Sequence, residues 1–248
     1  MLETYVYIFA SVLIVSFISF VGVVVLGLQE QRLRSILLYL VSFSAGALLG
    51  DVFLHLLPEM SEVGFGVAEG FYFLIGLVIF FILERFIQWQ HSHGEHSEEV
   101  HSSVYLTMAG DSLHNFIDGM VIAASFLVNP TLGVATTLAV IFHEIPQEIG
   151  QFAILLHGGW SKVKAIWYNF ASALTSIAGA GLVVLFARHI EAAPSFLLAF
   201  AGASFIYIAL SDIVPQLHKE ESKEKSVWQF LWLILGIALM GGLLLLEA

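Results

Sequence analysis

Long apolar runs separated by short polar joints dominate the chain. A helix needs about 20 mostly apolar residues to cross a bilayer, and eight stretches come close to or exceed this length. They cover residues 4–28, 36–57, 70–89, 103–129, 132–156, 163–187, 194–217 and 226–246. We therefore predict an all-α membrane protein: a bundle of eight transmembrane helices that forms a single domain over residues 1–248.

Composition and charge narrow the function. The chain is 58% hydrophobic and 12% charged, whereas soluble domains are roughly 45–50% apolar and about 25% charged. This excludes most cytosolic enzyme classes and disordered proteins. Twenty acidic against nine basic residues argue against nucleic acid and for cationic partners. The chain has no cysteine, so thiolate zinc sites are excluded, and its ten histidines need an explanation.

Basic residues are distributed unevenly over the joints, and this predicts orientation. If both termini lie outside the cytoplasm, Arg188 is the only basic residue on the outer side. The inner joints then hold Arg32, Arg34, Arg85, Lys162, Lys164, Lys219, Lys223 and Lys225. We expect a multi-pass protein with extracytoplasmic termini and a cytoplasmic His-rich loop at 90–102. In a bacterium or archaeon it would lie in the cytoplasmic membrane.

A weak internal repeat relates two of the spans. Residues 45–47 (AGA) precede Pro58, and residues 201–203 (AGA) precede Pro215. These helices run in opposite directions, as in the inverted repeats of transporters, although small residues and prolines are also common in unrelated membrane helices. Small-residue faces are compatible with a homodimer. They are formed by Gly22 and Gly27, and by Gly236, Gly241 and Gly242.

Span 103–129 carries polar residues where the bilayer is most apolar. An ionisable group there costs about 2.5–3.5 kcal/mol on insertion scales. Asp111, His114, Asn115 and Asp118 fall within eight residues. His114 and Asp118 are four positions apart and share one helix face. Together the imidazole, amide and carboxylate form a donor set suited to first-row divalent metals.

Span 132–156 carries a second cluster, at residues 143–148 (HEIPQE). His143 pairs with Gln147 at four-residue spacing, and Glu144 pairs with Glu148. The two spans are joined by a short turn, so they pack antiparallel and their polar faces meet at one depth. A lone buried polar residue often only bonds a neighbouring helix. Two facing clusters favour a metal site, within which Asp111 and Glu148 are either ligands or supports of ligands.

At these residues the sequence resembles the ZIP (Zrt/Irt-like) divalent metal transporters. The resemblance is carried by residues 114–119 (HNFIDG) and 143–148 (HEIPQE), and it covers the whole chain. Residues 50–58 (GDVFLHLLP) and 206–212 (IYIALSD) look closest to the LIV-1 branch of that family.

The resemblance implies transport of zinc, or of iron(II), manganese or cadmium, toward the cytoplasm, with no enzymatic activity and no prosthetic group. The implied ligands are His114, Asn115, Asp118, His143, Glu144 and Gln147. Many relatives carry His or Glu where this chain has Gln147, a neutral and weaker donor. Some bacterial members add a Glu from the sixth span; the candidates here are Ser176 and Asn169, so a full second metal site is in doubt.

Other polar residues fit a route for the ion. Asp51, His55 and Asp212 are expected along the path through the bundle. His91, His93 and His96 lie in the inner loop, where a His-rich tract captures metal weakly or serves only as a polar linker.

Two other classes of protein remain open. Residues 143–147 read HExxQ, one residue short of the HExxH of zinc metalloproteases. An intramembrane protease is disfavoured by Gln147, by Pro146 and by the metal-ligating set on the other span. A passive divalent-cation channel is the second alternative, and it would need weaker or multiple ion sites.

Overall fold

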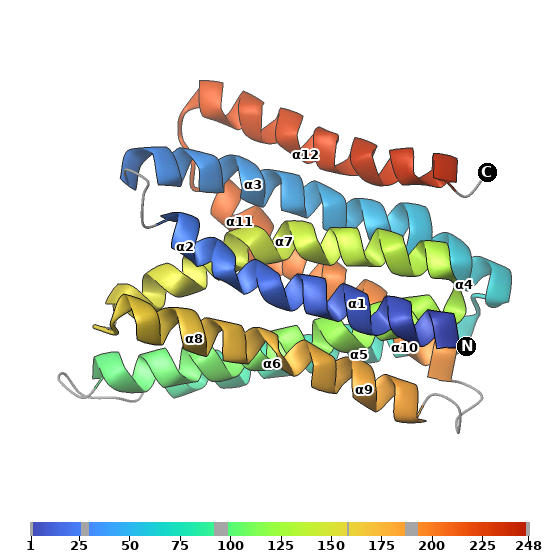
Figure 1. Cartoon of the computed structure of the whole chain (residues 1–248). Coiled ribbons are helices and arrows are strands. Elements are labelled where there is room, and N and C mark those ends of the chain that lie inside the picture. Colours follow the sequence, from blue (N-terminus) through green and yellow to red (C-terminus); the bar gives the residue numbers. More distant parts are fainter. Residues whose placement is uncertain (1, 26–29, 92–98, 158, 187–192, 247–248) are drawn as a thin grey trace.

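The protein, seen in a computed structural model, consists of helices joined by short turns in its described residues, which are 2–25, 30–91, 99–157, 159–186 and 193–246 (Figure 1). This confirms the predicted all-α class. One run of helix overlaps each predicted span, and the number of membrane crossings stays a prediction. The runs are α1 (Leu2–Ile18) with η1 (Ser19–Val21) and α2 (Gly22–Val25); α3 (Glu30–Asp51) with η2 (Val52–Leu56) and α4 (Leu57–Val63); α5 (Val67–His91); α6 (Glu99–Val128); α7 (Pro130–His157); α8 (Lys162–Ala173) with α9 (Thr175–Phe186); α10 (Ala193–Tyr207) with η4 (Ile208–Ile213) and α11 (Val214–Leu217); and α12 (Lys223–Leu243) with η5 (Leu244–Leu246).

Four helical runs in the described chain are long and apolar enough to cross a membrane. They are Leu2–Val21, Ile36–Glu62, Lys162–Phe186 and Lys223–Leu243. Large apolar side chains on the outside, such as Phe81 and Leu235, are exposed, whereas Asp118 and Glu144 are fully buried. Apolar groups outside and ionisable groups inside are what a protein surrounded by hydrocarbon requires. Helices α6 and α7 are also long, but their ionisable clusters lower their hydropathy.

The helices lie side by side in one bundle, roughly along a common axis (Figure 1). The start of α1 and the end of α12 lie at one end. The start of α6 and the end of α7 lie at the other end. In the interior, α6 packs against both α7 and α9, and α3 packs against α12 and α7. Because α6 and α7 are antiparallel neighbours, residues near the middle of each meet at the same depth.

Glycine allows the closest helix pair around this centre. On α6, a Cβ added at Gly119 would collide with the Ser176 carbonyl of α9. In return, a Cβ added at Gly179 would collide with the Phe116 carbonyl. The same reciprocal arrangement joins Gly46 of α3 and Gly236 of α12, each against the partner's backbone. These contacts fix how α6 is rotated against α9, and therefore which of its residues face α7.

Two of the glycines that we assigned to a dimer face pack within the chain. Gly236 lies against α3, and a Cβ at Gly22 would sit 2.7 Å from the Phe152 ring. Both are buried, so the expectation that they offer faces to a second chain is wrong for these two. Gly241 and Gly242 have more open surroundings, and Gly27 lies outside the described residues.

The two spans of the proposed repeat share a local irregularity. In one, the π-helical segment η2 (Val52–Leu56) comes just before Pro58; in the other, the π-helical segment η4 (Ile208–Ile213) comes just before Pro215. A proline cannot donate to the carbonyl four residues back, and a π-turn is one way to accommodate this. π-turns are frequent at functional sites, and these two hold His55 and Asp212.

Candidate metal centre

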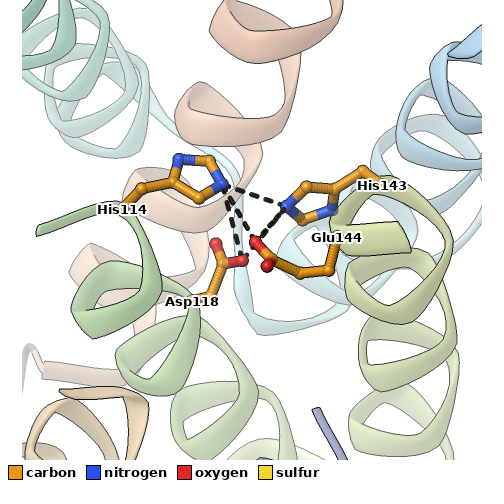
Figure 2. Close-up of side chains that lie close together, drawn as sticks. All are labelled: His114, Asp118, His143 and Glu144. Atoms are coloured by element: carbon orange, nitrogen blue, oxygen red, sulfur yellow. Dashed lines mark hydrogen bonds and ion pairs between the residues drawn. The ribbon is translucent and has the colours of Figure 1, made fainter. Parts of the chain in front are cut away.

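Helix α6 supplies His114 and Asp118 to the centre of the bundle. Their four-residue spacing places both side chains on the face that looks toward α7 (Figure 2). The Asp118 side chain is fully buried, whereas the His114 side chain retains 20% of its exposure. The charged group therefore lies deepest, and His114 is the accessible member of the pair.

Helix α7 supplies His143 and Glu144, which are 2% and 0% exposed. The helix continues through Pro146, which has no N–H to donate to the Phe142 carbonyl. Ser44 of α3 takes over this role, with its Oγ 2.6 Å from the Phe142 oxygen. The backbone one residue before His143 is thus held by a side chain from another helix.

The four side chains converge on one point (Figure 2). One ligand atom from each lies within 4.8 Å of all the others. The His143 Nε2 atom lies 3.0 Å from Asp118 Oδ2 and 3.5 Å from Glu144 Oε1. The His114 Nε2 atom lies 3.7 Å from Asp118 Oδ2 and 3.4 Å from Glu144 Oε1. Tetrahedral zinc with bonds of about 2.0–2.1 Å separates its ligands by about 3.3 Å, so these distances match one coordination sphere.

The buried oxygens of this cluster lack hydrogen-bond donors. Both carboxylate oxygens of Asp118 and both of Glu144 are buried without a hydrogen-bond partner. His143 Nδ1 lies 3.2 Å from the Ala139 carbonyl, an acceptor, so Nδ1 carries a proton and Nε2 offers its lone pair to the centre in the neutral ring. Burying two carboxylates beside imidazoles that are neutral is costly. A divalent cation held by these atoms would satisfy all of them at once.

Asn115 and Gln147 lie beside this four-residue cluster. The Asn115 amide donates to the Asp111 carbonyl at 3.2 Å, and its Oδ1 is buried without a partner. The Gln147 side chain is hydrogen-bonded to the Asp111 carboxylate. Gln147 thus contacts a different carboxylate from the four converging side chains, and its role as a direct ligand stays a prediction.

Asp111 and Glu148 lie one turn away, against α8. Ser172 donates to Asp111 Oδ2 at 2.5 Å, and Asn169 donates to Glu148. Ser176, by contrast, bonds the Ala173 carbonyl and lies 3.1 Å from Ser16 Oγ. The Ser176 hydroxyl therefore bonds the end of α8 and lies against Ser16 of α1.

The expected route residues are placed as follows. Asp51 is fully buried and accepts a hydrogen bond from Thr136 at 3.2 Å. His55 Nε2 lies 3.0 Å from the Met240 carbonyl. Asp212 lies in η4 and His91 ends α5, but their side chains are outside the described set, and His93 and His96 lie outside the described residues.

Sequence reasoning missed the hydroxyl groups that hold these polar residues. Ser44 and Thr136 bond groups on other helices, and no spacing rule along one helix points to them. Ser172 had a signal: it lies three residues after Asn169, so both share one face of α8.

Comparison with known proteins finds a family of zinc transporters. The family described as ZIP Zinc transporter matches residues 2–105 and 88–244. A protein named Zinc transporter ZIP13 from Pongo abelii is 37% identical over 81% of this chain and 65% of its own length. The Zinc transporter ZIP13 homolog of Drosophila melanogaster is 30% identical over 86% of this chain and 79% of its own length.

A third relative, Zinc transporter SLC39A7 of Mus musculus, is 29% identical over 86% of this chain and 63% of its own length. The chain thus spans slightly less than two thirds of two of these three relatives. Relatives with these names belong to the LIV-1 branch, which confirms the expected branch of the family. By the match along nearly its whole length and the identity to these relatives, the chain belongs to the ZIP zinc transporter family.

Proposed function

We propose that this protein carries zinc and related divalent metal ions across a membrane, through a site between α6 and α7. One observation carries the proposal: His114, Asp118, His143 and Glu144 bring two imidazole nitrogens and two carboxylate oxygens within 4.8 Å of one another. Imidazole with carboxylate is a donor set for first-row metals. The relatives named as zinc transporters support zinc as the principal cargo, with iron(II), manganese and cadmium as candidates of the same size and charge.

The same proposal extends to the ligand set and the direction of transport. Asn115 and Gln147 complete the set of six implied by the resemblance. Transport runs toward the cytoplasm, from the end that holds the start of α1 to the end that holds the start of α6. The placement of these ends in Figure 1 supports the proposed orientation in the membrane, since the lysine-bearing starts of α8 and α12 lie at the same end.

The architecture we propose is one transmembrane domain with eight spans and both termini outside the cytoplasm. The matching π-helical segments before Pro58 and Pro215 support an inverted repeat. The packing of the two repeat helices also supports it. Helix α3 packs on α12, which lies in the other half of the chain, and α10 correspondingly packs on α5. Gly241 and Gly242 are the remaining small residues for a homodimer contact. The cytoplasmic membrane is the proposed location in a prokaryotic cell.

The position of Glu144 favours transport over peptide hydrolysis. In an HExxH protease the glutamate acts as a general base beside the metal. Here Glu144 Oε1 lies 3.4 and 3.5 Å from the two imidazole nitrogens, in the position of a ligand. The dense ligand set likewise favours a carrier over a channel, because a channel must release ions from weak sites.

Metal-resolved uptake into proteoliposomes tests the proposal. Purified protein is reconstituted, and zinc, iron(II), manganese and cadmium are offered singly at equal free concentration. We expect saturable uptake that exceeds that of protein-free liposomes and is led by zinc. Unitary currents would assign the channel class instead, and chelator-sensitive cleavage of a peptide without uptake would assign the protease class.

A further inference from the structure

A buried phenylalanine of α10 lies against one of the two histidines of the metal centre. The ring centroids of Phe205 and His143 are 6.0 Å apart, and the ring planes are inclined at 65°. Aromatic rings attract each other in such edge-to-face arrangements at centroid separations of about 4.5–7 Å. Phe205 is fully buried and His143 is 2% exposed. The contact is therefore shielded from solvent, and it joins α10 to the metal-bearing helix α7.

This contact restrains the part of the His143 side chain that its hydrogen bond leaves free. Nδ1 lies 3.2 Å from the Ala139 carbonyl, one turn back on the same helix. A hydrogen bond at one ring atom fixes the position of that atom, but the ring can still tilt about it. The flat Phe205 ring, packed at a steep angle, opposes this tilt. Together the two contacts determine the direction in which the Nε2 lone pair points.

Among the described residues, His114 has no comparable support. Its side chain is 20% exposed. The polar and ring contacts that it makes with described residues are those with His143, Asp118 and Glu144, all within the metal centre itself. The two imidazoles are therefore held unequally. His143 is held from outside the centre, whereas His114 is held by the other members of the centre.

We propose that Phe205 is a positioning residue, which holds His143 as the fixed ligand of the metal centre while His114 adjusts to the ion. The inference rests on the proposed function, because it concerns the same four-residue site. Phe205 has no donor atom for a metal, so it acts only through the His143 ring. Groups that orient a metal ligand typically change metal affinity about 10–100-fold when they are removed.

The visible spectrum of bound cobalt(II) and zinc calorimetry test the orientation of His143. Phe205→Leu removes the ring. The matched control is Phe200→Leu, since Phe200 is a second buried phenylalanine of α10 whose ring packs against Phe80 and Phe196. The absorption of bound cobalt depends on the geometry of its ligands. We expect Phe205→Leu to shift this spectrum and to lower zinc affinity about tenfold, about 1.4 kcal/mol. Phe200→Leu should keep the parent spectrum and affinity, and equal behaviour of the two variants would overturn the proposal.

A double-mutant cycle identifies the histidine through which Phe205 acts. In the His114→Ala background, Phe205→Leu should again lower zinc affinity about tenfold. In the His143→Ala background it should have no further effect, because the imidazole that Phe205 supports is gone. A residue that only packs the bundle would weaken zinc binding equally in both backgrounds, and that result would contradict the positioning role.

A second variant and the parent protein complete the test. Phe205→Met replaces the flat ring by a flexible apolar chain, so it carries the same comparison if Phe205→Leu does not fold. A parent protein that neither binds cobalt nor takes up zinc would contradict the proposed function itself. If the parent takes up zinc and Phe205→Met matches it in cobalt spectrum and zinc affinity, the function stands and the role of Phe205 is overturned.

Discussion

The Nε2 atoms of His114 and His143 lie 3.2 Å apart, although 29 positions separate the two residues in the chain. Nδ1 of His143 lies against the Ala139 carbonyl, so in the neutral ring its Nε2 has no proton to share with His114. A separation of this size is about that of two ligands on one tetrahedral ion. The contact is therefore better understood as two halves of a metal site than as a hydrogen bond that stabilises the bundle.

Removal of either imidazole is expected to reduce uptake. His114→Ala and His143→Ala should each lower zinc uptake into proteoliposomes at least tenfold, about 1.4 kcal/mol or more, because each takes away one donor of the cluster. Zinc binding by calorimetry should fall in parallel. Ser125→Ala serves as the control and should match the parent. Undiminished zinc binding in the double alanine variant would show that the site lies elsewhere.

Acid should inhibit transport at equal free metal. The side chains coordinate zinc only when the imidazole nitrogen and the carboxylate are deprotonated, so protons compete with the ion. Initial uptake should fall as the external pH is lowered from about 7 toward 5, and raising free zinc should restore it. Uptake that rises steadily over this range, with occupancy unchanged, would mean that proton competition at these ligands does not control the rate.

Gln147→Glu should tighten metal binding and slow turnover. The new carboxylate adds negative charge next to Asp111, which the Gln147 side chain contacts. In the empty site this charge is costly to bury and is relieved by taking up a proton, which the arriving metal then displaces. Calorimetry in two buffers of different ionisation enthalpy counts the protons released per metal. A variant that releases no more protons and binds no tighter would remove Gln147 from the ligand set.

Gly179→Ala should destabilise the bundle, whereas Gly181→Ala should not. A Cβ at Gly179 collides with the Phe116 backbone, but nothing lies within 4 Å of a Cβ at Gly181 on the same helix. Overpacking costs about 1–3 kcal/mol, while alanine in an open helical position gains up to about 1 kcal/mol over glycine. The midpoint temperature of thermal unfolding in detergent should fall for Gly179→Ala and stay level or rise for Gly181→Ala. Equal shifts would contradict the α6–α9 packing.

Ser44 and Pro146 should depend on each other. Ser44→Ala removes the partner of the Phe142 carbonyl, and a buried group left unsatisfied costs about 1–3 kcal/mol. Pro146→Ala restores an N–H four residues after that carbonyl, so Ser44→Ala should cost less in the Pro146→Ala background. A double-mutant cycle on the thermal midpoint measures this coupling. Additive effects would indicate that Ser44 acts through another contact.

The sequence by itself determined the helices and the residues that face inward. The length of the apolar runs predicts each helix. The four-residue spacing of His114 and Asp118 places both on one helix face, and this does not depend on the neighbouring helices. The motif at 143–148 and the short joint to the previous span also predict that the two clusters meet. These features depend only on local geometry, which repeats in every α-helix.

The tertiary structure alone decided which atoms meet. The rotation of α6 is set by the glycine contacts of Gly119 and Gly179 with α9, and one residue of rotation, about 100°, would change every partner across the interface. For this reason the four-residue spacing places Gln147 on the face of α7 that carries His143, whereas its hydrogen bond to Asp111 of α6 depends on the fold. For the same reason Ser44 and Ser172 had no role until α3 and α8 were in place. Contacts between helices depend on the register and rotation of whole segments, and a local sequence pattern predicts neither.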